Sequence, residues 1–186
     1  MRNDVCITPA QVDLMNTLRR LWMEHVLWTR AFIMSTLTDA GDIEEVTKRL
    51  LQNPTDFAEA LTPLYGETNA KRFEEFFRGH LLIAAALVNA AKEGDMNAYN
   101  EQRVKWYENA DDIANFLAEL NPNWDENDWK TMLYDHLYMT EVEAMQIAGN
   151  QYANSIQQFD EIQAQALDMA DEMVRGLIAQ FPAKFG

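Results

Sequence analysis

The sequence predicts an all-α fold, an antiparallel bundle of about five long helices with one pair of short helices. Apolar residues recur every three or four positions along most of the chain, and no stretch shows the alternation of a strand. The seven glycines and five prolines stand mostly between these periodic stretches. A length of 186 residues with 48% hydrophobic and 24% charged residues suits one globular domain over residues 1–186.

The first helix is predicted over residues 9–38. Thr8 is a suitable N-cap, and Pro9 fits the first helical position because its missing N–H would have no partner there. Spacings of three and four place one set of mostly apolar side chains on the inner face: Leu14, Leu18, Leu21, His25, Trp28 and Phe32. The helix is expected to end before the polar run 39–42.

Two short helices are predicted next, over residues 42–52 and 55–64. The first is expected to stop at Asn53-Pro54, because proline interrupts the helical hydrogen-bond ladder. The second is expected to stop at Tyr65-Gly66.

Four further long helices complete the predicted bundle, each bounded by glycine, proline or asparagine. Gly94-Asp95, Asn121-Pro122 and Phe181-Pro182 mark clear ends, whereas Gly149-Asn150 either interrupts or bends the chain. The predicted ranges are 67–93, 96–120, 125–148 and 151–180.

A weak internal repeat accompanies these helices. A shift of 56 residues lays Asn53 on Asn109 and His80 on His136, together with several apolar positions, and His25 precedes His80 by 55. A shift of 60 instead lays Ala110-Asp111 on Ala170-Asp171. Such matches arise by chance or reflect a duplicated helical hairpin in which one helix carries a histidine and the next an Asn/Asp pair.

Composition excludes several kinds of function. A net charge of −15 argues against binding to nucleic acid or to an anionic membrane surface, since both need basic patches. A single cysteine, Cys6, excludes an internal disulfide and a thiolate metal cluster. The start of the chain lacks the apolar core of a signal peptide, and the longest apolar run, 81–88, is too short to span a bilayer. We therefore expect a cytoplasmic protein.

The three histidines of the chain share one unusual placement. His25, His80 and His136 each lie on an otherwise apolar helical face, near the middle of a predicted long helix. In an antiparallel bundle the ends of the helices exchange height while their midpoints stay level. The sequence therefore predicts that the three imidazoles meet in one buried layer.

Acidic and amide side chains are available at the same height. Asp112 and Asn109 lie near the middle of their helix, and Glu24 and Asp135 directly precede two of the histidines. Glu143 follows His136 by seven residues on the same face, where a buried carboxylate needs a cation such as Arg30 or Arg78, a donor or water.

These residues allow two interpretations. In the first, His25, His80 and His136 with Glu143 and Asp112 bind Zn, Fe or Mn, and Glu24, Asp135 and Asn109 orient the ligands. An open coordination position would then suit hydrolytic or redox chemistry on a small molecule. In the second, the protein is a non-catalytic bundle that binds a partner or forms a homodimer, and its histidines are hydrogen-bonded core residues.

Known helical metal motifs do not decide between them. The chain contains no Glu-x-x-His, no His-Glu-x-x-His and no His-x-x-x-His. Whether the protein is an enzyme stays open at this point.

Four stretches resemble a small family of bacterial helical proteins: LWMEHVLWTR, GHLLIAAALVNAAKEGD, ENADDIANFLAELNP and DMADEMVRGLIAQFP. The resemblance covers nearly the whole chain and implies an all-helical fold. It carries no activity and no site residues to this protein.

Overall fold

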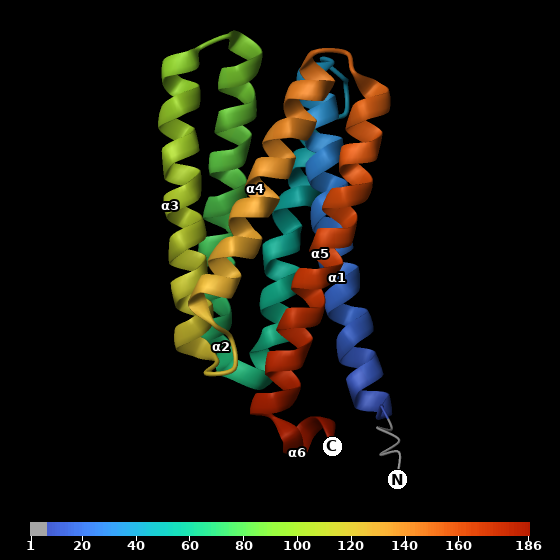
Figure 1. The fold of residues 1–186 in the computed structure, drawn as a ribbon, viewed down its shortest axis with the longest axis vertical. Helices are drawn as coiled ribbons and strands as arrows, with labels where there is room; N and C mark the ends of the chain where they lie inside the picture. Colours follow the sequence, from blue (N-terminus) through green and yellow to red (C-terminus); the bar gives the residue numbers. More distant parts are fainter. Residues whose placement is uncertain (1–6) are drawn as a thin grey trace.

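The structure is a computed structural model that describes residues 7–186 (Figure 1). This part of the chain contains helices and no strands, so the predicted all-α class is confirmed. The helices are α1 (Pro9–Leu37), α2 (Ile43–Glu93), α3 (Met96–Leu120), α4 (Glu126–Ala148), α5 (Tyr152–Gln180) and α6 (Pro182–Phe185).

Helix α2 reverses its direction at Gly66, where φ is 76° and ψ is 165° (Figure 1). This left-handed backbone is open to glycine and strained for other residues, so the predicted break at Tyr65-Gly66 is confirmed. Phe57 packs on Phe73 across the reversal, with 5.8 Å between ring centroids. The fold is therefore three antiparallel hairpins: α1 with the first half of α2, the second half of α2 with α3, and α4 with α5.

The predicted break at Asn53-Pro54 is wrong, because the first half of α2 continues through both residues. Asn53 is fully buried, and its side chain donates to the carbonyl of Leu21 on α1 at 3.0 Å. Arg78 donates to the carbonyl of Leu51 at 2.9 Å, close to the place where Pro54 interrupts the ladder. Tertiary contacts thus hold a kinked helix where the sequence predicts two short ones.

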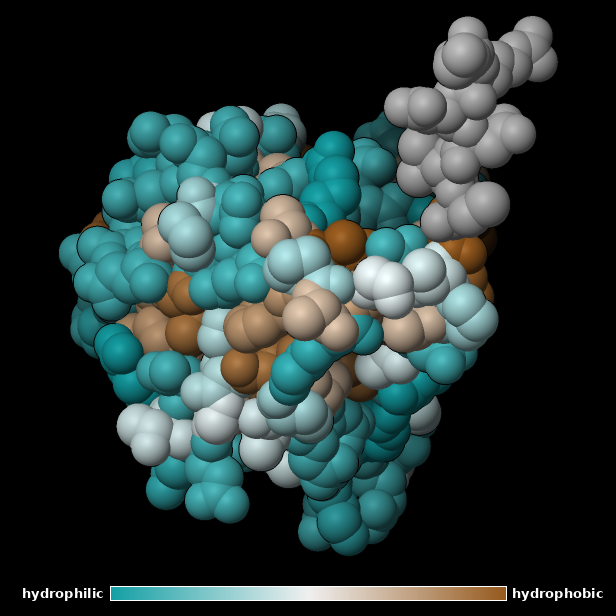
Figure 2. Space-filling model, turned by 90° about the horizontal axis from the view of Figure 1, so that it is seen from below, coloured by the Kyte–Doolittle hydropathy of each residue, from teal (hydrophilic) through white to brown (hydrophobic). Residues whose placement is uncertain are grey.

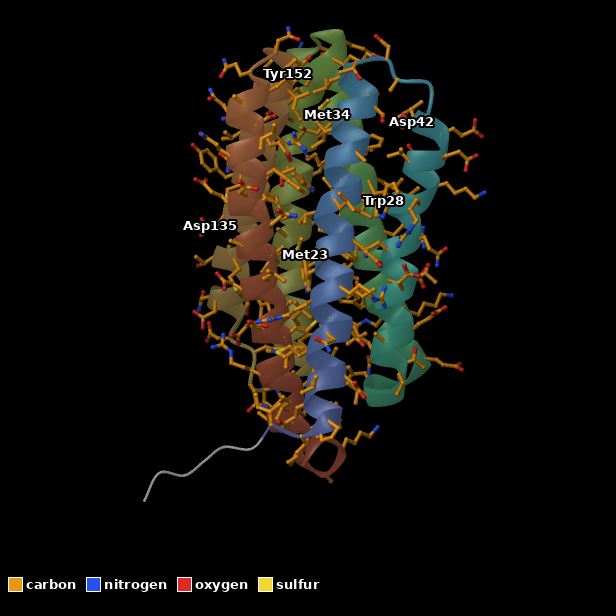
Figure 3. The ribbon with its side chains drawn as sticks, turned by 90° about the vertical axis from the view of Figure 1, so that its right-hand side faces the viewer. Met23, Trp28, Met34, Asp42, Asp135 and Tyr152 are labelled. Carbon is orange, nitrogen blue, oxygen red and sulfur yellow. The ribbon has the colours of Figure 1, made fainter. Side chains whose placement is uncertain are left out.

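The long helices form a closed ring in which each packs on its neighbour in the chain and α5 packs on α1. Figure 3 shows α1 lying between α5 and the first half of α2. The residues buried deepest are large and apolar: Leu18, Leu21, Ile33, Phe57, Leu61, Leu117, Trp129, Leu137, Ile162, Met169, Met173 and Leu177.

The two ends of the described chain meet at the lower end of the bundle. Thr8 caps α1 and forms a capping box with Gln11, as its position before Pro9 predicts. Its hydroxyl also donates to the carbonyl of Phe185 at 2.9 Å. Seen from this end, apolar residues lie among hydrophilic ones (Figure 2), and an open groove of about 530 Å³ runs between α1, α2 and α6.

Within residues 7–186, no helix combines the length and the apolarity that crossing a membrane requires.

Candidate functional site

The three histidines lie in one buried layer, as their mid-helix positions predict. His25, His80 and His136 are 2%, 3% and 3% exposed and come from α1, the second half of α2 and α4. All three line the same internal cavity, and the ring centroids of His25 and His136 are 5.5 Å apart. Apolar and aromatic side chains complete the lining: Trp22, Phe73, Phe77, Ile113, Leu117, Trp129, Leu133 and Met173.

Both ring nitrogens of His80 have partners. The indole N–H of Trp106 donates to Nε2 at 3.1 Å, so the ring proton lies on Nδ1, which donates to Oδ1 of Asn109 at 2.9 Å. The amide N–H of Asn109 in turn donates to the carbonyl of Phe76, four residues before His80, at 3.2 Å. Asn109 therefore orients the ring, as predicted for a residue beside the histidine layer.

His136 repeats this arrangement in the third hairpin. Its Nδ1 lies 3.1 Å from Oε1 of Gln165, and the amide N–H of Gln165 donates to the carbonyl of Met132 at 2.8 Å. Met132 again stands four residues before the histidine, and Gln165 stands 56 residues after Asn109.

The first hairpin has half of the arrangement. Asn53, 56 residues before Asn109, donates to the carbonyl of Leu21, four residues before His25. Nδ1 of His25 and Oδ1 of Asn53 are both buried without a hydrogen-bond partner. The contacts thus follow the 56-residue shift through three hairpins, and the 60-residue shift has no counterpart in them.

Burial keeps the layer neutral. Removal from water lowers the pKa of His80 to about 3 and that of His136 to about 4. The pKa of His25 lies well below its usual value, first because of burial and then because of the neighbouring charges of His136 and His80 in their protonated forms. All three rings are therefore uncharged at neutral pH.

Three of the predicted carboxylates do not join the layer. Asp112 on α3 and Asp135 on α4 are exposed (Figure 3 labels Asp135), because neither lies on the inner face of its helix. Glu24 binds Arg20 at 2.8 Å and Arg49 at 3.0 Å instead. Adjacency in sequence to a histidine placed these side chains about 100° around the helix from it, which is too far to share its contacts.

Glu143 forms a separate buried ion pair. It is 1% exposed and pairs with Arg30, which also donates to the carbonyl of Ser155 at 3.1 Å. Burial raises the pKa of Glu143, and the charge and hydrogen bond of Arg30 oppose that rise. Of the two predicted partners Arg30 is therefore the right one, whereas Arg78 pairs with Glu74.

The five predicted metal ligands do not fit a metal ion as they stand. Among the described residues, no three histidine, cysteine or acidic side chains are arranged to hold one. His80 has no free ring nitrogen, and the cavity in the layer has about 10 Å³ for the centre of a water molecule, space for about one water.

Sequence reasoning missed two members of the layer. Gln165 carried a usable signal, since it lies one 56-residue shift beyond Asn109, but a glutamine in place of asparagine hid the match. Trp106 carried none, because indoles at helical spacing are common in any core.

Comparison of the chain with family models, with curated proteins and with solved structures gave no match.

Proposed function

We propose that the protein is a non-catalytic helical bundle in which the histidine layer fixes how three hairpins pair. The observation that carries this proposal is the repeated contact of a side-chain amide with a carbonyl four residues before a histidine, in all three hairpins. In the second and third hairpins the histidine ring bonds the same amide. A layer with one water's worth of space has no room for a substrate.

Such a layer specifies register because its contacts are directional. A buried donor or acceptor without a partner costs about 1–3 kcal/mol, so a hairpin that slid along its neighbour would lose several such contacts at once. Apolar packing alone tolerates such slips more easily, because it has no direction. A polar layer that is almost fully satisfied thus favours one arrangement of the helices.

A second candidate function is binding of Zn, Fe or Mn through His25 and His136. It is favoured by the unpartnered Nδ1 of His25, by the 5.5 Å between the two ring centroids and by the neutral state of both rings. His80 would join only after losing the N–H of Trp106 from its Nε2. A bound ion would supply Lewis acidity.

Elemental analysis of tag-free protein distinguishes the two candidates. The hydrogen-bonded layer predicts far less than one metal per chain and a melting temperature that is unchanged by a chelator or by added Zn, Mn or Fe. Near-stoichiometric metal that is lost in both His25→Ala and His136→Ala would overturn the first candidate. A Glu119→Gln variant, altered at an exposed acidic residue, controls for metal held at the surface.

A non-catalytic bundle acts through what it binds, and the homodimer expected from the sequence is part of this proposal. Light scattering after size-exclusion chromatography measures it directly. A monomer at every concentration tested would leave other partners as the route by which the bundle acts.

A further inference from the structure

A second polar group is buried in the upper half of the bundle, away from the histidine layer. Glu141 on α4 is 6% exposed and lines two adjoining cavities of about 20 and 60 Å³. The two cavities share Glu141 with Leu87, Val88 and Ala144. They lie where the second half of α2 and α3 spread away from α4 in Figure 1.

The remaining walls are almost entirely apolar. Alanines account for much of the lining, so short side chains leave the space that longer ones would fill. The larger cavity is completed by Leu37, Ala91, Tyr99, Met145 and Ala148. Water is poorly held in such a space because it finds few polar partners there.

The carboxylate of Glu141 is incompletely matched. Arg103 of α3 places its Nε 2.7 Å from Oε1, yet this oxygen has no hydrogen bond of acceptable geometry. The Arg103 side chain is 43% exposed and also stacks on Tyr107, with 4.7 Å from its guanidinium carbon to the ring centroid. The cation therefore approaches Glu141 from the outer side, and the cavity side of the carboxylate faces apolar walls and the ring of Tyr99.

We propose that this cavity binds a small organic ammonium ion, with its charged group on Glu141 and its alkyl chain among the apolar walls. A buried carboxylate beside an aromatic ring is the chemistry that recognises an ammonium group. At about 10–15 Å³ for each non-hydrogen atom, the larger cavity holds about four to six atoms. Propylammonium to pentylammonium ions have this size. The site is independent of the role proposed for the histidines.

Calorimetric titration with alkylammonium chlorides at pH 7 tests the proposal. Each added methylene should tighten binding about fourfold until the cavity is full, and then the gain should stop. Butylammonium should bind with a Kd of about 1 mM or tighter, and butan-1-ol, which lacks the charge, at least tenfold more weakly than that. Absence of saturable butylammonium binding, or equal binding of the alcohol, would overturn the proposal.

Two variants assign any binding to this carboxylate. Glu141→Gln should weaken butylammonium binding at least tenfold, whereas Glu119→Gln, which removes an exposed acid with a 63% exposed side chain, should leave it unchanged. Arg103→Ala removes the competing cation and should tighten binding. This variant keeps the test decisive if Glu141→Gln does not fold, because an unchanged or weaker affinity in Arg103→Ala would also refute the proposal.

Discussion

Acid should unfold this protein through its histidine layer. The folded rings resist protonation, with pKa values of about 3 for His80 and about 4 for His136 and a value well below the usual one for His25. In the unfolded chain the same rings titrate near 6.5. A group with a depressed folded pKa contributes stability that is complete above the unfolded pKa and is lost as the pH falls toward the folded one.

The size of the effect follows from the gap between the two states. At pH 5 an unfolded imidazole lies 1.5 pH units below its pKa of 6.5, so each ring favours unfolding by about 2 kcal/mol. Three rings together remove about 6 kcal/mol, which is comparable to the whole stability of many domains. We therefore expect the free energy of unfolding to fall steeply between pH 6.5 and pH 5.

Urea unfolding followed by circular dichroism at pH 7, 6, 5.5 and 5 measures this loss. A His136→Gln variant should be less stable at pH 7 but should lose about 2 kcal/mol less than the parent between pH 7 and pH 5. Comparing the two pH profiles cancels the contribution of the carboxylates, and all three histidines of the sequence lie in the layer. Parallel profiles for variant and parent would refute the reasoning, since the folded rings would then accept protons.

Three substitutions test the packing, each by urea unfolding at pH 7. Gly176→Ala would place a Cβ 1.9 Å from Nε1 of Trp124 and should cost about 1–3 kcal/mol or more, because an indole ring cannot yield easily. Gly66→Ala forces a side chain onto a backbone with φ of 76° and should cost about 1–3 kcal/mol. Arg30→Ala strands the carboxylate of Glu143, which is 1% exposed, and should cost about 3–5 kcal/mol.

Matched controls accompany these substitutions. Gly79→Ala meets nothing closer than 3.8 Å, and Gly41→Ala meets nothing within 4 Å, so both should be neutral or stabilising by up to about 1 kcal/mol. Arg19→Ala removes a half-exposed ion pair with Asp171 and should cost about 1 kcal/mol or less. A glycine or arginine variant no less stable than its control would contradict the contact assigned to it.

Local signals in the sequence predicted most of the helical boundaries. Thr8-Pro9, Tyr65-Gly66 and Gly94 act through their own backbone chemistry, so the helices begin or end close to where these residues stand. Asn53-Pro54 misled for the opposite reason. Its helix is held by the bond from Asn53 to Leu21, 32 residues away, which no local pattern reveals.

The candidate site divides in the same way. Helical periodicity and mid-helix position predicted that the three histidines share a layer, and Asn109 was recognised beside them. Asp112 and Asp135 were misplaced because height along a bundle says nothing about which way a side chain faces. Glu141 was not recognised at all, since only the spreading of α3 from α4 leaves a cavity around it.

The sequence by itself determined the helical class, the reversal at Gly66 and the depth of the three imidazoles, because each depends on periodicity or on the backbone of one residue. Only the tertiary structure decided which partner each ring bonds. The amides of Asn109 and Gln165 and the indole of Trp106 reach the histidines from separate helices. Hydrogen bonds extend about 3 Å and have direction, so their formation depends on the packing of whole helices against one another.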